Sequence, residues 1–274
     1  MHTSVVYATD DAWATRVSAC VRRGIERDER LLYFAHRTPP ETVFATLADR
    51  GIDVAAARRR GQLSVRTAQE SYLAELPFDP DTVIRQWHTA TREALEAGFT
   101  GLRAMGEMDW YGAGVPGAER LLEYELRMHR EAFDLLPLAA MCLYDRRLLP
   151  DRDVALLEAA HLSRIREPGE RLHPPVLAVT PLADRPGLGL TGELNADSRA
   201  ALAGALATLR HGSDGDEVDL TSLVHIDAAA TAGLAAVALR TPARRLTVRG
   251  APPSLLRTID LFPELGAALE VPSR

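Results

Sequence analysis

The sequence predicts two α/β domains, because short apolar runs alternate along it with longer stretches of helical periodicity. Leu31–Ala35 and Leu138–Tyr144 are apolar runs of strand length, and helical stretches separate such runs. This alternation favours a parallel, doubly wound sheet with helices on both faces. The segment 166–175 contains three prolines and several charges, and 274 residues exceed one typical domain. We therefore expect a larger domain at 1–165 and a smaller α/β domain at 172–274.

Residues at the ends of the apolar runs indicate where the helices of the first domain begin and end. Asp10 or Asp11 is expected to cap the first helix, Pro39 and Pro40 to open the second, and Gly51 to end it. The remaining helices are expected at 53–60, 80–97, 117–131 and 152–161, and the strands at 4–8, 31–35, 63–66, 102–108 and 138–144.

The second domain is arranged around the stretch Val218–Leu239. Its apolar run, 218–226, is expected to form one buried strand that ends at Asp227, and an Ala- and Leu-rich helix follows. The carboxyl end of a strand then meets the amino end of a helix, where free N–H groups favour anions. Further strands are expected at 176–179, 188–190 and 246–248, and helices at 253–262 and at 198–210, the latter capped by Asn195 or Asp197.

The composition is ordinary for a soluble globular protein, with 46% hydrophobic and 26% charged residues. A net charge of −6 and the lack of zinc-finger or basic-region patterns disfavour nucleic-acid binding. Cys20 and Cys142 are too few for a disulfide framework. No apolar run has the length of a membrane span, and no signal-peptide pattern opens the sequence. We expect a cytoplasmic protein with no membrane or nucleic-acid partner.

Part of the central stretch matches a known pattern in residue type and spacing, at Asp219, Leu220, Thr221, Ile226 and Asp227. It resembles the centre of a STAS domain, the fold of anti-sigma-factor antagonists. The resemblance implies an anti-sigma factor or an ATPase-type kinase as the partner. In that family a kinase phosphorylates the hydroxyl residue after the second Asp, but this chain has alanines there. The partner surface, with a degenerate phosphosite, is expected at Asp227, Ala228, Ala229 and Thr231.

The first domain contains six motifs that agree in order with one family. They are His2-x-Ser4-x-x-Tyr7, Arg30–Tyr33, Gly61–Leu63, Gly106–Met108 followed by Trp110, Gly117–Glu125, and Cys142–Asp145. The domain thereby resembles the methanogen/methylotroph sensory (MEDS) domain. The resemblance implies a sensor of small, hydrocarbon-derived molecules on a RecA-like fold. Ser4 stands where many members have Cys, which weakens the case for a thiol function at that position.

Ligands of open α/β sheets bind beyond the carboxyl ends of the strands, and this rule selects the candidate ligand-binding residues. Glu107 follows such a strand, and its alternative role is to cap a helix or to pair with an arginine. The family match adds two helical glutamates, Glu119 and Glu123. A solvated helix face on which Arg127 neutralises their charge is the alternative explanation. Trp110 lies in a glycine-rich loop that would suit a lid, but tryptophans are more often core residues. The full set is Tyr7, His36, Glu107, Trp110, Glu119, Glu123 and Tyr144.

The sequence predicts neither metal binding, nor a cofactor, nor catalysis. His88, His129 and His161 lie on separate helices without metal-ligand spacing, and Cys142 in its apolar strand suits a small core residue. The loop 8–12 stands where a phosphate-binding P-loop would lie, between the first strand and the first helix. It has no glycine and no lysine, and it carries two aspartates that would repel phosphate. We expect a non-catalytic signalling protein that regulates transcription. The alternative is a nucleotide-binding or nucleotide-hydrolysing enzyme built on the first domain.

Overall fold

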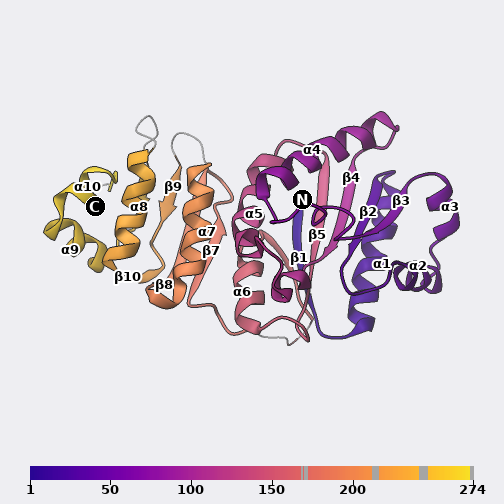
Figure 1. Ribbon diagram of the computed structural model, residues 1–274, viewed down its shortest axis with the longest axis horizontal. Helices are drawn as coiled ribbons and strands as arrows, with labels where there is room; N and C mark the ends of the chain where they lie inside the picture. Colours follow the sequence, from indigo (N-terminus) through magenta and orange to yellow (C-terminus); the bar gives the residue numbers. More distant parts are fainter. Residues whose placement is uncertain (168, 170–171, 212–215, 241–245, 272–274) are drawn as a thin grey trace. The chain divides into compact units, whose positions relative to one another are not determined.

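The computed structural model describes residues 1–167, 169, 172–211, 216–240 and 246–271. It contains two compact units, each built around its own β-sheet (Figure 1). Both sheets carry helices, so the predicted α/β class is confirmed for both parts. Parts of the proline-containing segment 166–175 lie outside the described residues.

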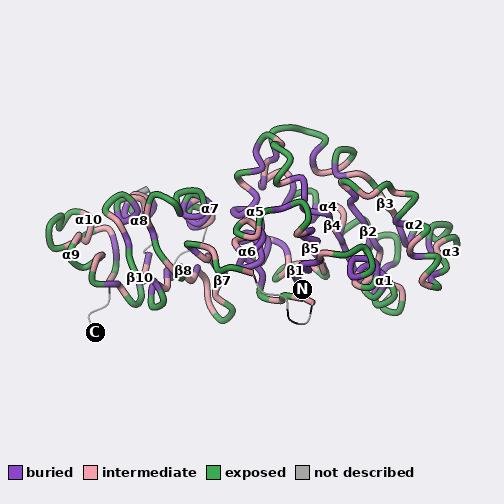
Figure 2. The backbone as a smooth tube through the Cα atoms, turned by 90° about the horizontal axis from the view of Figure 1, so that it is seen from below, coloured by how far each residue is buried: buried purple, intermediate pink, exposed green. Residues whose placement is uncertain are grey.

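The larger sheet has six parallel strands in the order β3-β2-β4-β5-β1-β6. The five predicted strands are β1 (His2–Tyr7), β2 (Arg30–Ala35), β3 (Leu63–Thr67), β4 (Leu102–Glu107) and β5 (Leu138–Asp145). The sequence analysis missed β6 (Ser163–Ile165), because three residues with an arginine in the middle carry no apolar run. Every residue of β1 is buried, and Figure 2 shows buried backbone along the central strands of this sheet.

The two faces of this sheet are covered by different helices. Paired residues of parallel strands point to the same side, and alternate residues of one strand point to opposite sides. Tyr33 and Leu143 face a core formed with α1 (Asp10–Glu26), α2 (Pro40–Asp49) and α3 (Val54–Arg59). Phe34 faces the other side, where it packs edge-on against Trp87 of α4 (Pro80–Glu96). The sheet is therefore doubly wound, as predicted.

Several helix boundaries differ from the predicted ones for local reasons. Thr9, rather than Asp10 or Asp11, caps α1, because its hydroxyl accepts the Ala12 N–H at 3.2 Å. The predicted helix 117–131 is divided into a 3₁₀ turn (Ala118–Arg120), α5 (Leu121–Met128) and a π turn (His129–Phe133). Helix α6 (Asp151–Ala159) follows β5. Gly51 follows α2 with φ +76, as expected for a residue that ends a helix.

The smaller sheet corrects the prediction of one strand across 218–226. Its strands are β7 (Leu177–Pro181), β8 (Gly187–Leu194), β9 (Glu217–Asp219), β10 (Leu223–Ile226) and β11 (Thr247–Arg249), with β7 antiparallel to β8. Both β9 and β10 pair with the edge of β8 opposite β7, because Leu188 pairs with β7 and β9, and Gly192 pairs with β7 and β10. The Asp219 side chain accepts the Thr221 N–H at 2.9 Å, and this turn ends the first strand. Val224, expected in a buried strand, is 72% exposed.

The smaller unit contains α7 (Arg199–Arg210), α8 (Ala228–Arg240), α9 (Pro253–Leu261) and α10 (Pro263–Ala267), together with residues 122–127 of α5 and 155–162 at the end of α6. Asn195, one of the two predicted caps, forms a capping box with Ser198 just before α7. Within the described ranges, no helix combines the length and the apolar character that crossing a membrane requires.

Candidate functional site

Glu107, at the carboxyl end of β4, is a buried carboxylate with four hydrogen bonds. The Tyr33 hydroxyl donates to its Oε1 at 2.8 Å. The backbone N–H groups of His36, Arg37 and Thr38 donate to its Oε2 at 2.8–3.1 Å. Burial, reinforced by Glu107, raises the pKa of Tyr33, so this hydroxyl stays a donor. Glu107 thus fixes the segment that follows β2. This role resembles helix capping, the alternative to ligand binding that the sequence analysis gave for Glu107.

A band of charged and polar groups surrounds Glu107 at the same sheet edge. His36 Nδ1 lies 2.7 Å from Asp109 Oδ2. Arg147 pairs with Asp145 at 2.7 Å and with Asp10, the first residue of α1, at 2.8 Å. Burial, together with the nearby carboxylates, raises the pKa of Tyr7. The structure therefore brings Tyr7, His36 and Glu107 to one edge, as the strand-end rule predicts.

Trp110 and Tyr144 do not join that edge. Trp110 is fully buried and packs against Phe78 and Tyr72, with ring centroids 4.9 and 5.9 Å apart. Glu107 pairs with Leu143, so Tyr144, the next residue of β5, points to the opposite face of the sheet. The side chains of Glu107, Trp110 and Tyr144 therefore do not line one cleft. The packing of Trp110 corresponds to its alternative role in the core.

The opposite face of the sheet contains a pocket of about 240 Å³ between β2, β3 and α4. Apolar side chains form most of its wall: Leu32, Phe34, Tyr72, Val83, Trp87 and Ala90. Arg30 and Arg66 add positive charge, and Arg30 Nη1 lies 4.0 Å from Glu93 Oε2. Arg30 Nε is buried and has no acceptor among the described residues. The pocket therefore has mostly apolar walls, and one of its lining residues, Arg30, carries an unused hydrogen-bond donor.

In the smaller unit, the predicted partner residues surround the amino end of α8. Asp227 Oδ1 accepts the Ala230 N–H at 2.7 Å, and Arg199 pairs with Oδ2 at 2.9 Å. Ala228 and Ala229, the first residues of the helix, are exposed. Thr231 is fully buried, and its hydroxyl donates to the Asp227 carbonyl at 3.0 Å. The exposed surface here consists of methyl groups beside an ion pair, and the one nearby helical hydroxyl is inaccessible.

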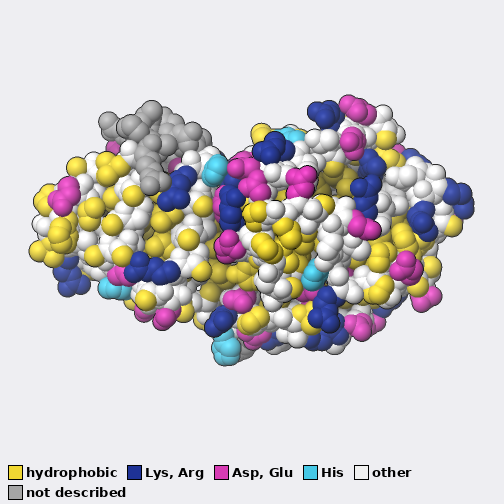
Figure 3. Space-filling view, in the orientation of Figure 1, with side chains coloured by type: hydrophobic (Ala, Val, Ile, Leu, Met, Phe, Trp, Pro, Cys, Tyr) yellow, Lys and Arg dark blue, Asp and Glu magenta, His cyan; other side chains and the backbone are white. Residues whose placement is uncertain are grey.

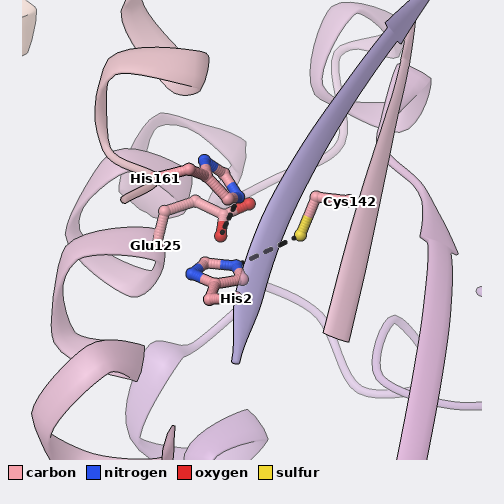
Figure 4. A group of neighbouring side chains, drawn as sticks. All are labelled: His2, Glu125, Cys142 and His161. Carbon is pink, nitrogen blue, oxygen red and sulfur yellow. Dashed lines mark hydrogen bonds and ion pairs between the residues drawn. The ribbon is translucent and has the colours of Figure 1, made fainter. Parts of the chain in front are cut away.

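Figure 4 labels two buried pairs of side chains that were missed from the sequence because their members are far apart in the chain. In the larger unit His2 Nε2 lies 3.3 Å from Cys142 Sγ, and in the smaller unit His161 Nε2 lies 3.6 Å from Glu125 Oε2. Burial, reinforced by the neighbouring His129, lowers the pKa of His2 well below its ordinary value. The expectation of no metal site stays a prediction.

Comparison with known proteins identifies the first part of the chain. A family model described as the methanogen/methylotroph, DcmR sensory (MEDS) domain matches residues 1–162, which is more than half of the chain. The chain belongs to the MEDS family. All the groups described above, apart from those around α8, fall within this MEDS part.

A second family model, described as an Mlab, STAS domain, matches residues 178–263 and thereby agrees with the predicted order of the two domains. A comparison with curated proteins gives no match. Among matching solved structures is a KaiC-like protein from Pyrococcus horikoshii OT3. The two proteins are 9% identical with a TM-score of 0.37, and the match covers 65% of this chain and 69% of that one.

The two helical glutamates of the MEDS part have different surroundings. Glu119 is exposed in a 3₁₀ turn, as expected for a solvated face. Glu123 is only 2% exposed and pairs with Arg127 at 3.0 Å inside the protein. The predicted pairing is therefore present, but the prediction that it lies on a solvated face is wrong. Glu123 is flanked in the sequence by the apolar residues Leu121, Leu122 and Tyr124. This flanking is a sequence signal of its burial.

Proposed function

We propose that this MEDS–STAS protein is a small-molecule-responsive regulator. In this proposal the MEDS part binds a compact, largely apolar molecule in the pocket beneath α4, and the STAS part conveys the bound state to a protein partner. The presence of both domains indicates a sensory and regulatory protein of the STAS family. The observation that carries the ligand proposal is the apolar pocket with the unused Arg30 donor.

The pocket limits the chemistry of the proposed ligand. Its volume, about 240 Å³, is below the roughly 300–1,000 Å³ of sites for drug-sized molecules. The walls favour a hydrocarbon body, and Arg30 favours an oxygen that accepts a hydrogen bond. A short ketone, alcohol or carboxylic acid fulfils both requirements. Such a ligand agrees with the hydrocarbon derivatives that the MEDS resemblance implies.

The test fills the pocket from its helical wall. Ala90 lines the pocket from α4, so Ala90→Leu occupies ligand space without introducing a poor helix former. Thr89→Leu is the matched control, because Thr89 is exposed on the same helix and does not line the pocket. We expect a panel of short ketones, alcohols and acids to raise the melting temperature of the wild type and of Thr89→Leu, but not of Ala90→Leu.

Two results would count against the pocket as the sensor site. One is a stabilising panel compound that still stabilises Ala90→Leu to the same extent. The other is a wild-type protein that responds to no panel compound and also carries no small molecule in native mass spectrometry.

The proposed partner is an anti-sigma factor or a related ATPase-type kinase, as the STAS resemblance implies. The exposed amino end of α8 supports this, because Ala228 and Ala229 offer an uncharged docking surface. On the face drawn in Figure 3, acidic and basic side chains are interspersed with apolar ones, without one large patch of a single sign. That distribution favours a protein partner over a nucleic acid.

The proposal includes no ATP hydrolysis. Asp10 and Asp11, in the first turn of α1 beside the position that a P-loop would take, pair with Arg147 and Arg50 at 2.8 and 2.5 Å. Those guanidinium groups already face carboxylates, so the loop is a poor phosphate site. Micromolar ATP affinity in calorimetry would instead support the alternative of a nucleotide-binding protein. A cytoplasmic location stays a prediction.

A further inference from the structure

The floor of the pocket beneath α4 has a guanidinium group at each end. Arg30, Leu32 and Phe34 are alternate residues of β2 and therefore face the same side of the sheet. Arg66 of β3 pairs with Phe34, which places it on that side as well. Four residues of a strand span about 13 Å, so Arg30 and Arg66 lie at opposite ends of the apolar floor.

The wall that α4 contributes contains one charged residue, and it lies near Arg30. The lining residues of this helix follow the spacing of a single helix face, and they are Val83, Gln86, Trp87, Ala90 and Glu93. Glu93 Oε2 lies 4.0 Å from Arg30 Nη1. The acidic group of the wall and the guanidinium of the floor therefore share one end of the pocket.

The charge of the lining indicates the charge of the ligand. Among the described residues, the lining carries two guanidinium groups and one carboxylate, so its net charge is +1. Burial raises the pKa of Tyr72, so this lining hydroxyl stays neutral. A neutral ligand leaves the positive charge uncompensated, whereas a ligand with one negative charge balances it. The lining therefore favours monoanions over neutral molecules and cations.

Arg30 is the better placed of the two guanidinium groups to bind an anion. Its side chain is 27% exposed, whereas Arg66 belongs to the exposed residues. Its contact with Glu93 is longer than a hydrogen bond, and the Glu93 side chain is 58% exposed. Arg30 Nε is buried and has no acceptor among the described residues. A carboxylate that accepts two parallel N–H bonds from the guanidinium would satisfy Arg30 better than Glu93 does.

We infer that the ligand of this pocket is a monocarboxylate with a short hydrocarbon chain, whose carboxylate binds Arg30 and whose chain lies over Leu32 and Phe34. The inference rests on the proposed function, because it concerns the same pocket and narrows the ligand from ketones, alcohols and acids to acids. Glu93 then competes with the ligand for Arg30. Removing Arg30 and removing Glu93 should therefore have opposite effects on acid binding.

The test measures dissociation constants by calorimetry on the full-length protein. Straight-chain acids from propionate to octanoate are compared with the corresponding primary amides, which have nearly the same shape and no charge. We expect an acid to bind about tenfold more tightly than its amide, because its hydrogen bonds to Arg30 are charge-assisted. Acid affinity should rise about fourfold with each methylene until the chain fills the pocket, since a buried CH₂ contributes about 0.8 kcal/mol.

Substitutions at both partners of the ion pair test the role of Arg30. Arg30→Gln should weaken acid binding about tenfold and leave amide binding nearly unchanged, and the retained amide binding shows that the variant is folded. Glu93→Gln should tighten acid binding several-fold, because it removes the competing carboxylate. Glu96→Gln is the matched control and should change neither affinity. Glu96 lies on the same helix and pairs with Arg92 at 3.9 Å, but it does not line the pocket.

The outcomes separate this inference from the proposed function. Equal affinity for acids and amides, or acid binding that Arg30→Gln leaves unchanged, would overturn the inference and keep the pocket as a sensor site for neutral molecules. If acids and amides both fail to bind while ketones or alcohols still stabilise the protein, the inference alone is wrong. If every one of these compounds fails, the proposed function is wrong as well.

Discussion

Burial distinguishes two glutamates that are only one helical turn apart in the sequence. Glu123 faces Arg127 at 3.0 Å with side-chain exposures of 3% and 4%, whereas Glu119 is exposed. Removing one partner of a buried ion pair costs about 3–5 kcal/mol, whereas an exposed substitution usually changes stability by less than about 0.5 kcal/mol. Glu123→Ala should therefore strongly destabilise the compact unit that contains residues 122–127, and Glu119→Ala should leave the stability of the protein nearly unchanged.

Urea unfolding followed by far-ultraviolet circular dichroism, which reports on the helices and strands of both units, measures this difference. Equal midpoints for the two variants would show that the Glu123–Arg127 pair contributes nothing measurable.

At the scale of single residues, the sequence predicts where a side chain lies better than it predicts which groups hydrogen-bond to it. It placed Tyr7, His36 and Glu107 at strand ends, and the structure brings these three to one edge. It did not predict that three consecutive N–H groups hold Glu107, because backbone donors leave no trace in residue identity. The pocket was missed for a related reason, since its wall needs the pairing of β2 with β3 and the position of α4.

Among the elements, α4 has the clearest dependence on a single cap. Asp79 Oδ2 accepts the Thr82 N–H at 3.0 Å, and Arg120 pairs with Oδ1 at 2.7 Å. Asp79→Ala should cost about 1–2 kcal/mol, because it removes the cap. Asp79→Asn keeps the cap and loses only the ion pair, so it should cost less than about 1 kcal/mol.

The pH dependence of this cap has a defined sign. Partial burial raises the pKa of Asp79, but the hydrogen bonds from Thr82 and the pair with Arg120 outweigh it and lower the pKa overall. A lowered pKa contributes stability above the ordinary value near 4, and that stability is lost as pH falls through the folded value. The stability gap between the wild type and Asp79→Asn should therefore be largest near neutral pH and close below about pH 4. A gap that widens in acid would contradict this assignment.

The strands and helices show where sequence patterns stop being informative. Five of the six strands of the larger sheet follow from apolar runs, whereas β6 has only three residues and no such run. In the smaller sheet, the apolar residues of 218–226 suggested one strand. The turn that Asp219 forms with Thr221 divides them, and the two halves pair in succession with the same edge of β8. Local hydrogen bonding therefore interrupts the strand that the apolar pattern predicts.

For the whole molecule, the proposed regulation depends on coupling between ligand and partner. A ligand changes partner affinity only if it binds the two signalling states with different affinity, and the coupling is then reciprocal. Phosphorylation at the start of α8 would provide a second input in a typical STAS domain. This chain has Ala228 at that position, so we expect the ligand to be the remaining input.

The prediction is that the wild-type protein is not phosphorylated at α8 and that Ala228→Ser restores an acceptor. Residue 228 is exposed at the amino end of the helix, where the helix dipole and free N–H groups stabilise a phosphate. Thr231 cannot replace it, because its hydroxyl is fully buried and bonded to the Asp227 carbonyl. Each protein is incubated with candidate anti-sigma-type kinases and ATP, and phosphate is mapped by mass spectrometry.

Ala229→Ser is the matched control. It adds the same hydroxyl one residue further along α8, at a position that is also exposed. Phosphate confined to the Ala228→Ser variant would show that the docking surface is intact and that only the acceptor oxygen is missing. The added charge of about −1.5 to −2 should then weaken partner binding by that variant. Stoichiometric phosphate on Thr221, Ser222 or Thr231 of the wild type would overturn the prediction, because the switch would then have moved within the STAS domain.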